Sequence, residues 1–226
     1  KDSTKKLEIS EDTLDTKTIY IYDSNDKLIE ENKSDMYGPY EKIKYEDGNK
    51  VMKKEYNIIV KEMDDFDENV EFVWEKAKEY NSFIAVRNLE YLRTLYSNEK
   101  FIKLIFFDSG KIVGWSISLC TQLDNHKQFG YMKLGSIVDC LSIKGYETSI
   151  INKTSQILEK KGADLIVSNQ SHIFWKNAFK MNSFVNGPSN FIFASSVALS
   201  EKLESNIKSK NHIHLTRGDG DGPINL

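Results

Sequence analysis

In the amino-terminal part of the chain, apolar and polar residues alternate in short runs that are typical of β-strands. We expect strands at residues 18–22, 27–30, 41–45 and 51–60. The last two flank residues 46–49, whose Asp-Gly pair is a strong hairpin signal. Residues 1–16 are charged and poor in large apolar side chains, so we expect a mobile terminus there. This part of the chain is therefore predicted to form β-ribbons joined by polar turns.

After Asp67 the pattern changes to one in which helices and strands follow each other. We expect helices at residues 72–80, 86–96, 148–161 and 172–181. We expect strands at residues 101–107, 112–119, 133–141, 163–167, 190–199 and 212–215, with a polar loop at 124–128. Phe72 and Val73 open the predicted buried stripe of the first helix. The third helix has the clearest pattern, and Gly162 is well placed to end it.

The composition is that of a soluble globular protein. Of the 226 residues, 39% are hydrophobic and 29% are charged. The formal net charge of -3 gives no electrostatic reason to expect nucleic acid as a partner. No segment approaches the roughly 20 apolar residues of a membrane span, and no signal-peptide pattern is present. We therefore expect a cytoplasmic protein, and the opening Lys1 in place of Met leaves open that the chain is cut or is a fragment.

Cys120 and Cys140 lie in apolar segments that we interpret as neighbouring strands. Their placement favours buried free thiols in a reducing compartment, and a catalytic cysteine is the alternative. No compact Cys/His cluster indicates zinc, and we predict no metal site. His212 and His214 alternate on one strand face, which could bind a metal, but we favour an exposed tail.

The order of the predicted elements resembles the GNAT (N-acetyltransferase-like) fold, once residues 56–60 supply a first strand. Residues 111–115 (KIVGW) are similar to the family's strand after a tight turn, and residues 176–184 to an altered form of its last short helix. The resemblance implies an α/β (α+β) fold with a mixed, mostly antiparallel central sheet flanked by helices. It divides the chain into a β-ribbon connector or remnant of a preceding half, residues 1–55, and a GNAT-like acyltransferase domain, residues 56–226.

A narrower resemblance is to GNAT-like proteins linked with bacterial surface-polysaccharide synthesis, many of which have two GNAT halves in tandem. Residues 87–92 (RNLEYL) are similar to their R-x-x-E-Y-L helix, residues 137–141 (IVDCL) to their I-V-D-L-L strand, and residues 214–221 (HLTRGDGD) to their T-x-G-D-x-D segment. This resemblance implies a carboxy-terminal half, with a preceding half or a second copy of the chain as partner. For Asp219 and Asp221 we favour a turn or an interface over a calcium loop, which would need a later closing Glu.

The resemblance implies acetyl-CoA or another acyl-CoA as cofactor and a small-molecule or glycan-precursor amine or hydroxyl as acceptor. In the family, backbone N–H groups between the third strand and the long helix hold the pyrophosphate, in a Gln/Arg-x-x-Gly-x-Gly/Ala turn. Here the turn has Gly145 but lacks the second glycine, and Glu147 is unfavourable. The residues that the resemblance assigns to the cofactor are Leu141, Ser142, Ile143, Lys144, Gly145, Tyr146 and, on the pantetheine arm, Asn177.

Two residues are candidates for the catalytic base: Asp139, at the end of the third strand, and His172, which opens the short helix. The alternatives are a carboxylate held by backbone groups and a helix cap. The family's acid is commonly a Tyr, but Phe179 or Phe184 lies there, and a phenyl ring cannot donate a proton. Two functions remain open: an acyl-CoA-dependent N- or O-acyltransferase, which the resemblance narrowly favours because that activity defines the fold, and, as the alternative, a non-catalytic GNAT-like domain that pairs with another half or protein. The second predicts that side chains such as Tyr146 or Trp175 close the cofactor slot.

Overall fold

The computed structural model describes residues 6–11, 17–22, 27–35, 38–46, 49–53, 58–127, 129–187, 194–206 and 213–220. The chain divides into two compact units: an amino-terminal unit, residues 1–57, and a main unit, residues 58–226. The candidate site residues lie in the main unit.

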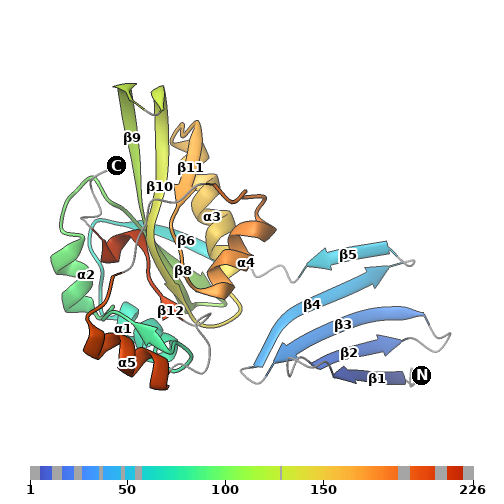
Figure 1. Ribbon diagram of the computed structural model, residues 1–226. Coiled ribbons are helices and arrows are strands. Elements are labelled where there is room, and N and C mark those ends of the chain that lie inside the picture. Colours follow the sequence, from blue (N-terminus) through green and yellow to red (C-terminus); the bar gives the residue numbers. More distant parts are fainter. Residues whose placement is uncertain are drawn as a thin grey trace. The chain divides into compact units, whose positions relative to one another are not determined.

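The amino-terminal unit contains a five-stranded antiparallel sheet in chain order (Figure 1). Its strands are β1 (Lys6–Glu11), β2 (Lys17–Tyr22), β3 (Leu28–Asp35), β4 (Gly38–Glu46) and β5 (Asn49–Lys53). The expected mobile terminus is wrong over β1. Leu7 pairs with Ile21 and Ile9 with Ile19 in the ladder to β2. The strand therefore forms although most residues around Leu7 and Ile9 are charged or polar.

The central sheet of the main unit has the strand order β11-β10-β9-β8-β6. These strands are β6 (Ile58–Met63), β8 (Ile102–Asp108), β9 (Lys111–His126), β10 (Gly130–Ser142) and β11 (Leu165–Ser168). All neighbours are antiparallel except β10 and β11, which are parallel. The expected loop at 124–128 is wrong in its bounds, because β9 continues to His126. The expected fold class, an α/β (α+β) fold with a mixed, mostly antiparallel central sheet flanked by helices, is confirmed.

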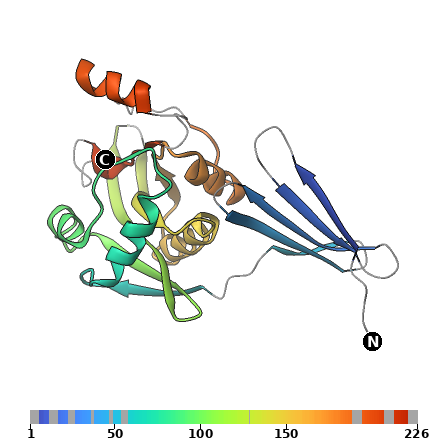
Figure 2. The same ribbon diagram turned by 90° about the horizontal axis from the view of Figure 1, so that it is seen from below.

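Four helices cover the sheet: α1 (Asn69–Ala77), α2 (Leu89–Leu95), α3 (Glu147–Lys160) and α4 (Ile173–Met181). Successive strand residues point to opposite faces. Trp115 packs in the cluster that contains residues of α1 and α2, whereas a side chain on Gly114 would meet Ile150 of α3. Helices α1 and α2 therefore lie on one face and α3 on the other, with α4 beside α3 (Figures 1 and 2).

Two details of the predicted helices are wrong. The second helix begins after Asn88, whose side chain caps it by accepting a 2.9 Å hydrogen bond from Tyr91 N. Arg87 therefore precedes the helix, and its side chain does not have to lie on the helix surface. On α1, Phe72 is 50% exposed, because the buried stripe consists of Val70, Val73 and Ala77 and does not include Phe72.

The predicted strand at 190–199 is also wrong where the structure describes it, because residues 197–199 open the helix α5 (Val197–Asn206). Residues 190–193 of that prediction lie outside the described residues. The strand β12 (Ile213–His214) pairs in parallel with β7 (Phe83–Ile84) rather than with the central sheet. A 3-10 turn, η2 (Arg217–Asp219), follows, and His212 lies outside the described residues. We call residues 213–220 the carboxy-terminal segment. Within the described ranges, no helix has both the length and the apolar character that a membrane crossing needs.

Candidate functional site

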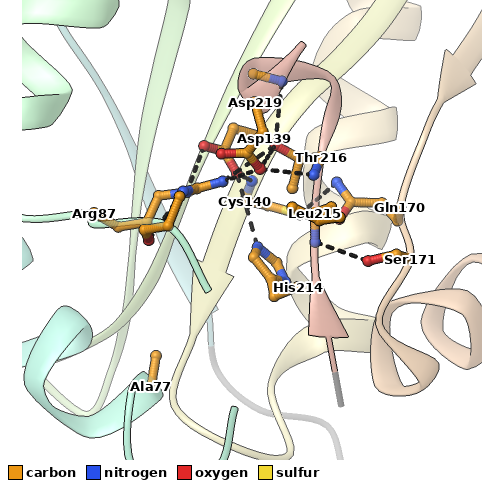
Figure 3. Close-up of polar contacts among 12 residues, drawn as sticks. Ala77, Arg87, Asp139, Cys140, Gln170, Ser171, His214, Leu215, Thr216 and Asp219 are labelled. Carbon is orange, nitrogen blue, oxygen red and sulfur yellow. Dashed lines mark hydrogen bonds and ion pairs between the residues drawn. The ribbon is translucent and has the colours of Figure 1, made fainter. Parts of the chain in front are cut away.

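Arg87, Asp139 and Asp219 come from segments far apart in the sequence and meet in one buried ionic cluster (Figure 3). Arg87 Nε lies 2.9 Å from Asp139 Oδ2, and Arg87 Nη2 lies 2.5 Å from Asp219 Oδ2. The side chains of Arg87 and Asp139 are 0% exposed. Burial by itself would lower the pKa of Arg87, but the two carboxylates outweigh it and raise the pKa. The three segments that carry the narrower family resemblance thus share one charged centre.

Asp139 is held on both carboxylate oxygens. Oδ2 also accepts a 2.8 Å hydrogen bond from the Tyr96 hydroxyl, and Oδ1 accepts one of 2.9 Å from Cys140 N. The β9–β10 register shifts between Ile137 and Asp139, and such a bulge re-aims the side chains beside it. Burial alone would raise the pKa of Asp139, but Arg87, His214 and Tyr96 together outweigh it and lower the pKa. A fully buried, ion-paired carboxylate is badly placed to take a proton from a substrate, so the geometry does not favour Asp139 as a base.

Asp219 joins the carboxy-terminal segment to this centre. Its Oδ2 accepts a 2.9 Å hydrogen bond from Thr216 N, while the Thr216 hydroxyl accepts one of 3.2 Å from Gly218 N. These reciprocal bonds form a capping box on η2. The same Asp219 oxygen therefore stabilises the turn and binds Arg87. The turn that the sequence favoured for Asp219 is present, and Asp221 lies outside the described residues.

His214 is fully buried beside this cluster, so the expected exposed tail is wrong for this residue. Its Nε2 lies 3.9 Å from Asp139 Oδ1, and its ring centroid lies 6.3 Å from that of Trp175. The cause is the parallel pairing of β12 with β7, which holds the carboxy-terminal segment within the main unit. The sequence signals for His214 were its alternation with His212 and its place at the start of residues 214–221. Burial lowers the pKa of His214.

The main unit is expected to lose stability as the pH falls below about 6.5, the ordinary pKa of histidine. Because burial lowers the pKa of His214, the unfolded chain binds a proton in this range before the folded chain does, and protons then favour unfolding. Asp139 does not contribute here, since its pKa is lowered from 3.8. Urea unfolding of the wild type and of His214→Gln between pH 7.5 and pH 5 checks this. The wild type should lose more stability on acidification, and equal losses would contradict the prediction.

The turn from β10 into α3 has a carboxylate at the place where a phosphate would sit. Gly145 has a φ of +94°, which favours glycine. Its N–H donates a 2.8 Å hydrogen bond to Oε2 of Glu147, the first residue of α3, which is 7% exposed. A helix amino terminus favours a negative charge, and Glu147 supplies one from within the chain. In this form, the turn does not fit the pyrophosphate of an acyl-CoA.

The neighbouring backbone groups are also engaged. The Tyr80 hydroxyl donates to Ser142 O, and Ile143 N donates a 2.9 Å bond to Val113 O, which continues the sheet. The Leu141 side chain belongs to the hydrophobic core. The turn thus brings the predicted cofactor residues 141–146 together, but the Ser142 carbonyl and the Ile143 and Gly145 N–H groups have partners within the protein. Tyr80 was missed because nothing in the sequence links it to Ser142.

The other side chains of the turn contact protein as well. Lys144 Nζ lies 4.9 Å from the centroid of the Phe174 ring, and the Tyr146 hydroxyl donates a 2.8 Å hydrogen bond to Asp108 Oδ2. Trp175, the other candidate to close the slot, is buried, and its ring centroid lies 6.3 Å from that of His214. Glu147 and Tyr80 both form hydrogen bonds with backbone groups of the turn.

On α4, His172 has the capping role that the sequence left open as an alternative. Its Nδ1 accepts a 3.2 Å hydrogen bond from Phe174 N, and the residue is 1% exposed. Asn177 is exposed. Phe179 and Phe184 pack edge to face, with ring centroids 4.8 Å apart. These phenyl rings leave the position of the family's acid without a proton donor.

Both cysteines are free, and Cys140 is buried whereas Cys120 is half-buried. Burial raises the pKa of the Cys140 thiol, which accepts a 3.5 Å hydrogen bond from Gln170 Nε2. A thiol with a raised pKa is a poor nucleophile. The geometry therefore favours the structural interpretation of Cys140 over the catalytic one.

No protein-family model and no curated protein matches the sequence. Among solved structures, the chain is similar to a GNAT family acetyltransferase from Staphylococcus aureus, with 14% identity, 61% of this chain and 98% of that chain covered, and a TM-score of 0.44. It is similar to a ribosomal-protein-alanine N-acetyltransferase from Brucella melitensis, with 12% identity, 61% and 99% covered, and a TM-score of 0.45. A third is an aminoglycoside N-acetyltransferase in complex with CoA, with 10% identity, 61% and 99% covered, and a TM-score of 0.41. At these values the similarity carries no conclusion about activity, and it gives no support for a tandem arrangement or for a link with polysaccharide synthesis.

Proposed function

We propose that the main unit is a non-catalytic GNAT-like domain that serves as a structural or substrate-positioning module, paired with another half or protein. The observation that carries this proposal is the buried Glu147 carboxylate bonded to Gly145 N at the start of α3. A cofactor pyrophosphate placed there would meet a negative charge of the chain, and like charges at close range repel. Binding would require Glu147 to leave or to take up a proton.

The candidates for acid–base chemistry support the same proposal. Asp139 is bound by Arg87 and Tyr96, and His172 caps a helix. Phe179 and Phe184 cannot protonate a leaving thiolate. Acyl transfer to an amine or hydroxyl needs a group that accepts a proton and one that returns it. Among the candidates that the sequence analysis named, none is free for either role.

The second candidate function is an acyl-CoA-dependent N- or O-acyltransferase that acts on a small-molecule or glycan-precursor acceptor. The observation that favours it is the divergence of β10 and β11. Their parallel pairing ends at Ile137–Ser168, whereas β10 continues to Ser142. The pantetheine arm of an acyl-CoA would lie beside this part of β10, which has no strand partner on the β11 side. Asn177 would bond to that arm, and the acyl-CoA would supply the acyl group.

Titration calorimetry with acetyl-CoA and with free CoA distinguishes the non-catalytic domain from the acyltransferase. We expect no binding tighter than about 1 mM for the folded wild type. We expect Glu147→Gly, which supplies the second glycine of the family's turn, to bind at least about tenfold more tightly, because it removes the repelling carboxylate. Micromolar binding by the wild type, lost on Gly145→Trp, would instead support the acyltransferase. Equal affinities of the wild type and Glu147→Gly would show that Glu147 is not the obstacle.

A further inference from the structure

A cavity of about 400 Å³ lies beside α4, and the turn from β10 into α3, which we call the cofactor turn, contributes no residue to its described lining. It is bounded by one face of α4, by the segment after that helix, by the residues that follow β11 and by Leu215 of the carboxy-terminal segment. We call it the α4 cavity. The contacts of α4 with α3 come from other residues, such as Met181, whose Sδ accepts a 3.6 Å hydrogen bond from the Thr148 hydroxyl. The volume lies in the range of small-molecule sites.

The walls of the α4 cavity combine an apolar part with a row of polar groups. Phe179, Phe184 and Leu215 supply the apolar part, and the two rings hold each other edge to face. Ser168 to Ser171 supply the polar row. Pockets that bind small molecules typically have an apolar lining with a few polar groups that orient the ligand.

The charged side chains in the described lining of the α4 cavity all have one sign. Lys176 and Lys180 stand one helical turn apart on the same face of α4, with Phe179 between them. Neither forms an ion pair with a described residue, and the described lining contains no Asp or Glu. The two ammonium groups therefore favour an anionic ligand.

Gln170 adds a requirement for a hydrogen-bond donor. Its Nε2 donates to Cys140 Sγ (Figure 3), but its buried Oε1 has no hydrogen-bond partner among the described residues. A buried acceptor without a donor costs about 1–3 kcal/mol. Because this oxygen is buried, a ligand hydroxyl or amine reaches it only after the Gln170 side chain turns toward the cavity, and that contact would remove the cost.

We propose that the α4 cavity binds a small organic anion with an apolar ring or chain and a hydroxyl or amine group. Lys176 and Lys180 bind the anionic head, Phe179 and Phe184 contact the apolar body, and Gln170 accepts the hydrogen bond. This site is independent of the cofactor turn and of the proposed function. It assigns the domain a ligand of its own.

The test is a ligand-observed NMR titration of the full chain with 4-hydroxybenzoate, with benzoate and 4-hydroxybenzamide for comparison. We expect the wild type to bind 4-hydroxybenzoate with a Kd on the order of 0.1–1 mM, and each comparison compound more weakly. Lys176→Gln combined with Lys180→Gln should weaken 4-hydroxybenzoate by about fivefold. Lys160→Gln, an exposed lysine of α3, is the matched control and should change nothing.

A further variant tests whether Gln170 Oε1 accepts the hydrogen bond from the ligand. Gln170→Met keeps the length of the side chain but removes the oxygen, so the advantage of 4-hydroxybenzoate over benzoate should disappear. The proposal is overturned if the folded wild type binds none of the three compounds, or if Lys160→Gln weakens binding as much as the double variant does. It is also overturned if CoA displaces 4-hydroxybenzoate, which would assign the probe to the cofactor slot.

Discussion

Replacing Arg87 with Met is expected to lower the free energy of unfolding of the main unit by about 3–5 kcal/mol. Met fills a similar volume but carries no charge. Asp139, which is fully buried, would then keep a negative charge without its cation or would have to take up a proton. Asp219 would lose the same partner, although its side chain is 10% exposed and loses less. The expected loss is large because removing one partner leaves the other charge buried.

Urea unfolding followed by tryptophan fluorescence measures this loss in the main unit alone. The chain has 3 tryptophans, Trp74, Trp115 and Trp175, and all lie after residue 57. Lys76→Met is the matched control, because Lys76 pairs with Glu79 while both side chains are more than half exposed. Such a pair contributes at most about 1 kcal/mol. A loss in Arg87→Met no larger than in Lys76→Met would refute the stabilising role of the buried cluster.

Gly218→Ala is expected to cost about 1–3 kcal/mol in the same measurement. A Cβ on Gly218 would lie 2.0 Å from Tyr96 Oη and 3.3 Å from Asp139 Oδ2. Tyr96 is fully buried and its hydroxyl is bonded to Asp139, so the ring has no free space into which it can move. The added methyl group must therefore displace either the tyrosine or the turn η2.

Two further variants identify the contact that is responsible. Gly187→Ala is the control, since a Cβ there has nothing within 4 Å, and its cost should be near zero. Tyr96→Phe removes the oxygen that the new methyl group meets. Gly218→Ala should therefore cost less in the Tyr96→Phe background than in the wild type. The same cost in both backgrounds would mean that the clash with Tyr96 Oη is not the cause.

The helices and strands were predictable from the sequence where the spacing of apolar residues repeats within a few positions. The apolar spacing of α3 and the short apolar strands β8 to β11 predicted the sheet and its clearest helix, since buried faces repeat within a few residues. Composition misled for β1, where Leu7 and Ile9 pair with β2 within a charged segment. Asn88 displaced the start of α2, because a side-chain cap outweighs apolar periodicity at a helix end.

The site was predictable only in part. The missing second glycine and Glu147 already indicated a poor phosphate turn. The sequence could not show that Glu147 would bond to Gly145 N, or that Tyr80 would reach Ser142, which lies 62 positions later. The three motif segments were visible one by one, but no local pattern encodes the contact of Arg87 with Asp219, 132 positions away.

That separation of 132 positions has a consequence for how the protein is made. A ribosome that has just released α4 has produced Arg87 and Asp139, but Asp219 and the turn that it caps are still to come. Contacts between residues so distant in the sequence close a long loop and tend to form late in folding. Until residues 213–220 emerge, His214 and Thr216 cannot cover the buried charges. A product truncated just after α4 should therefore behave as an incompletely folded protein, and cellular quality control would remove it.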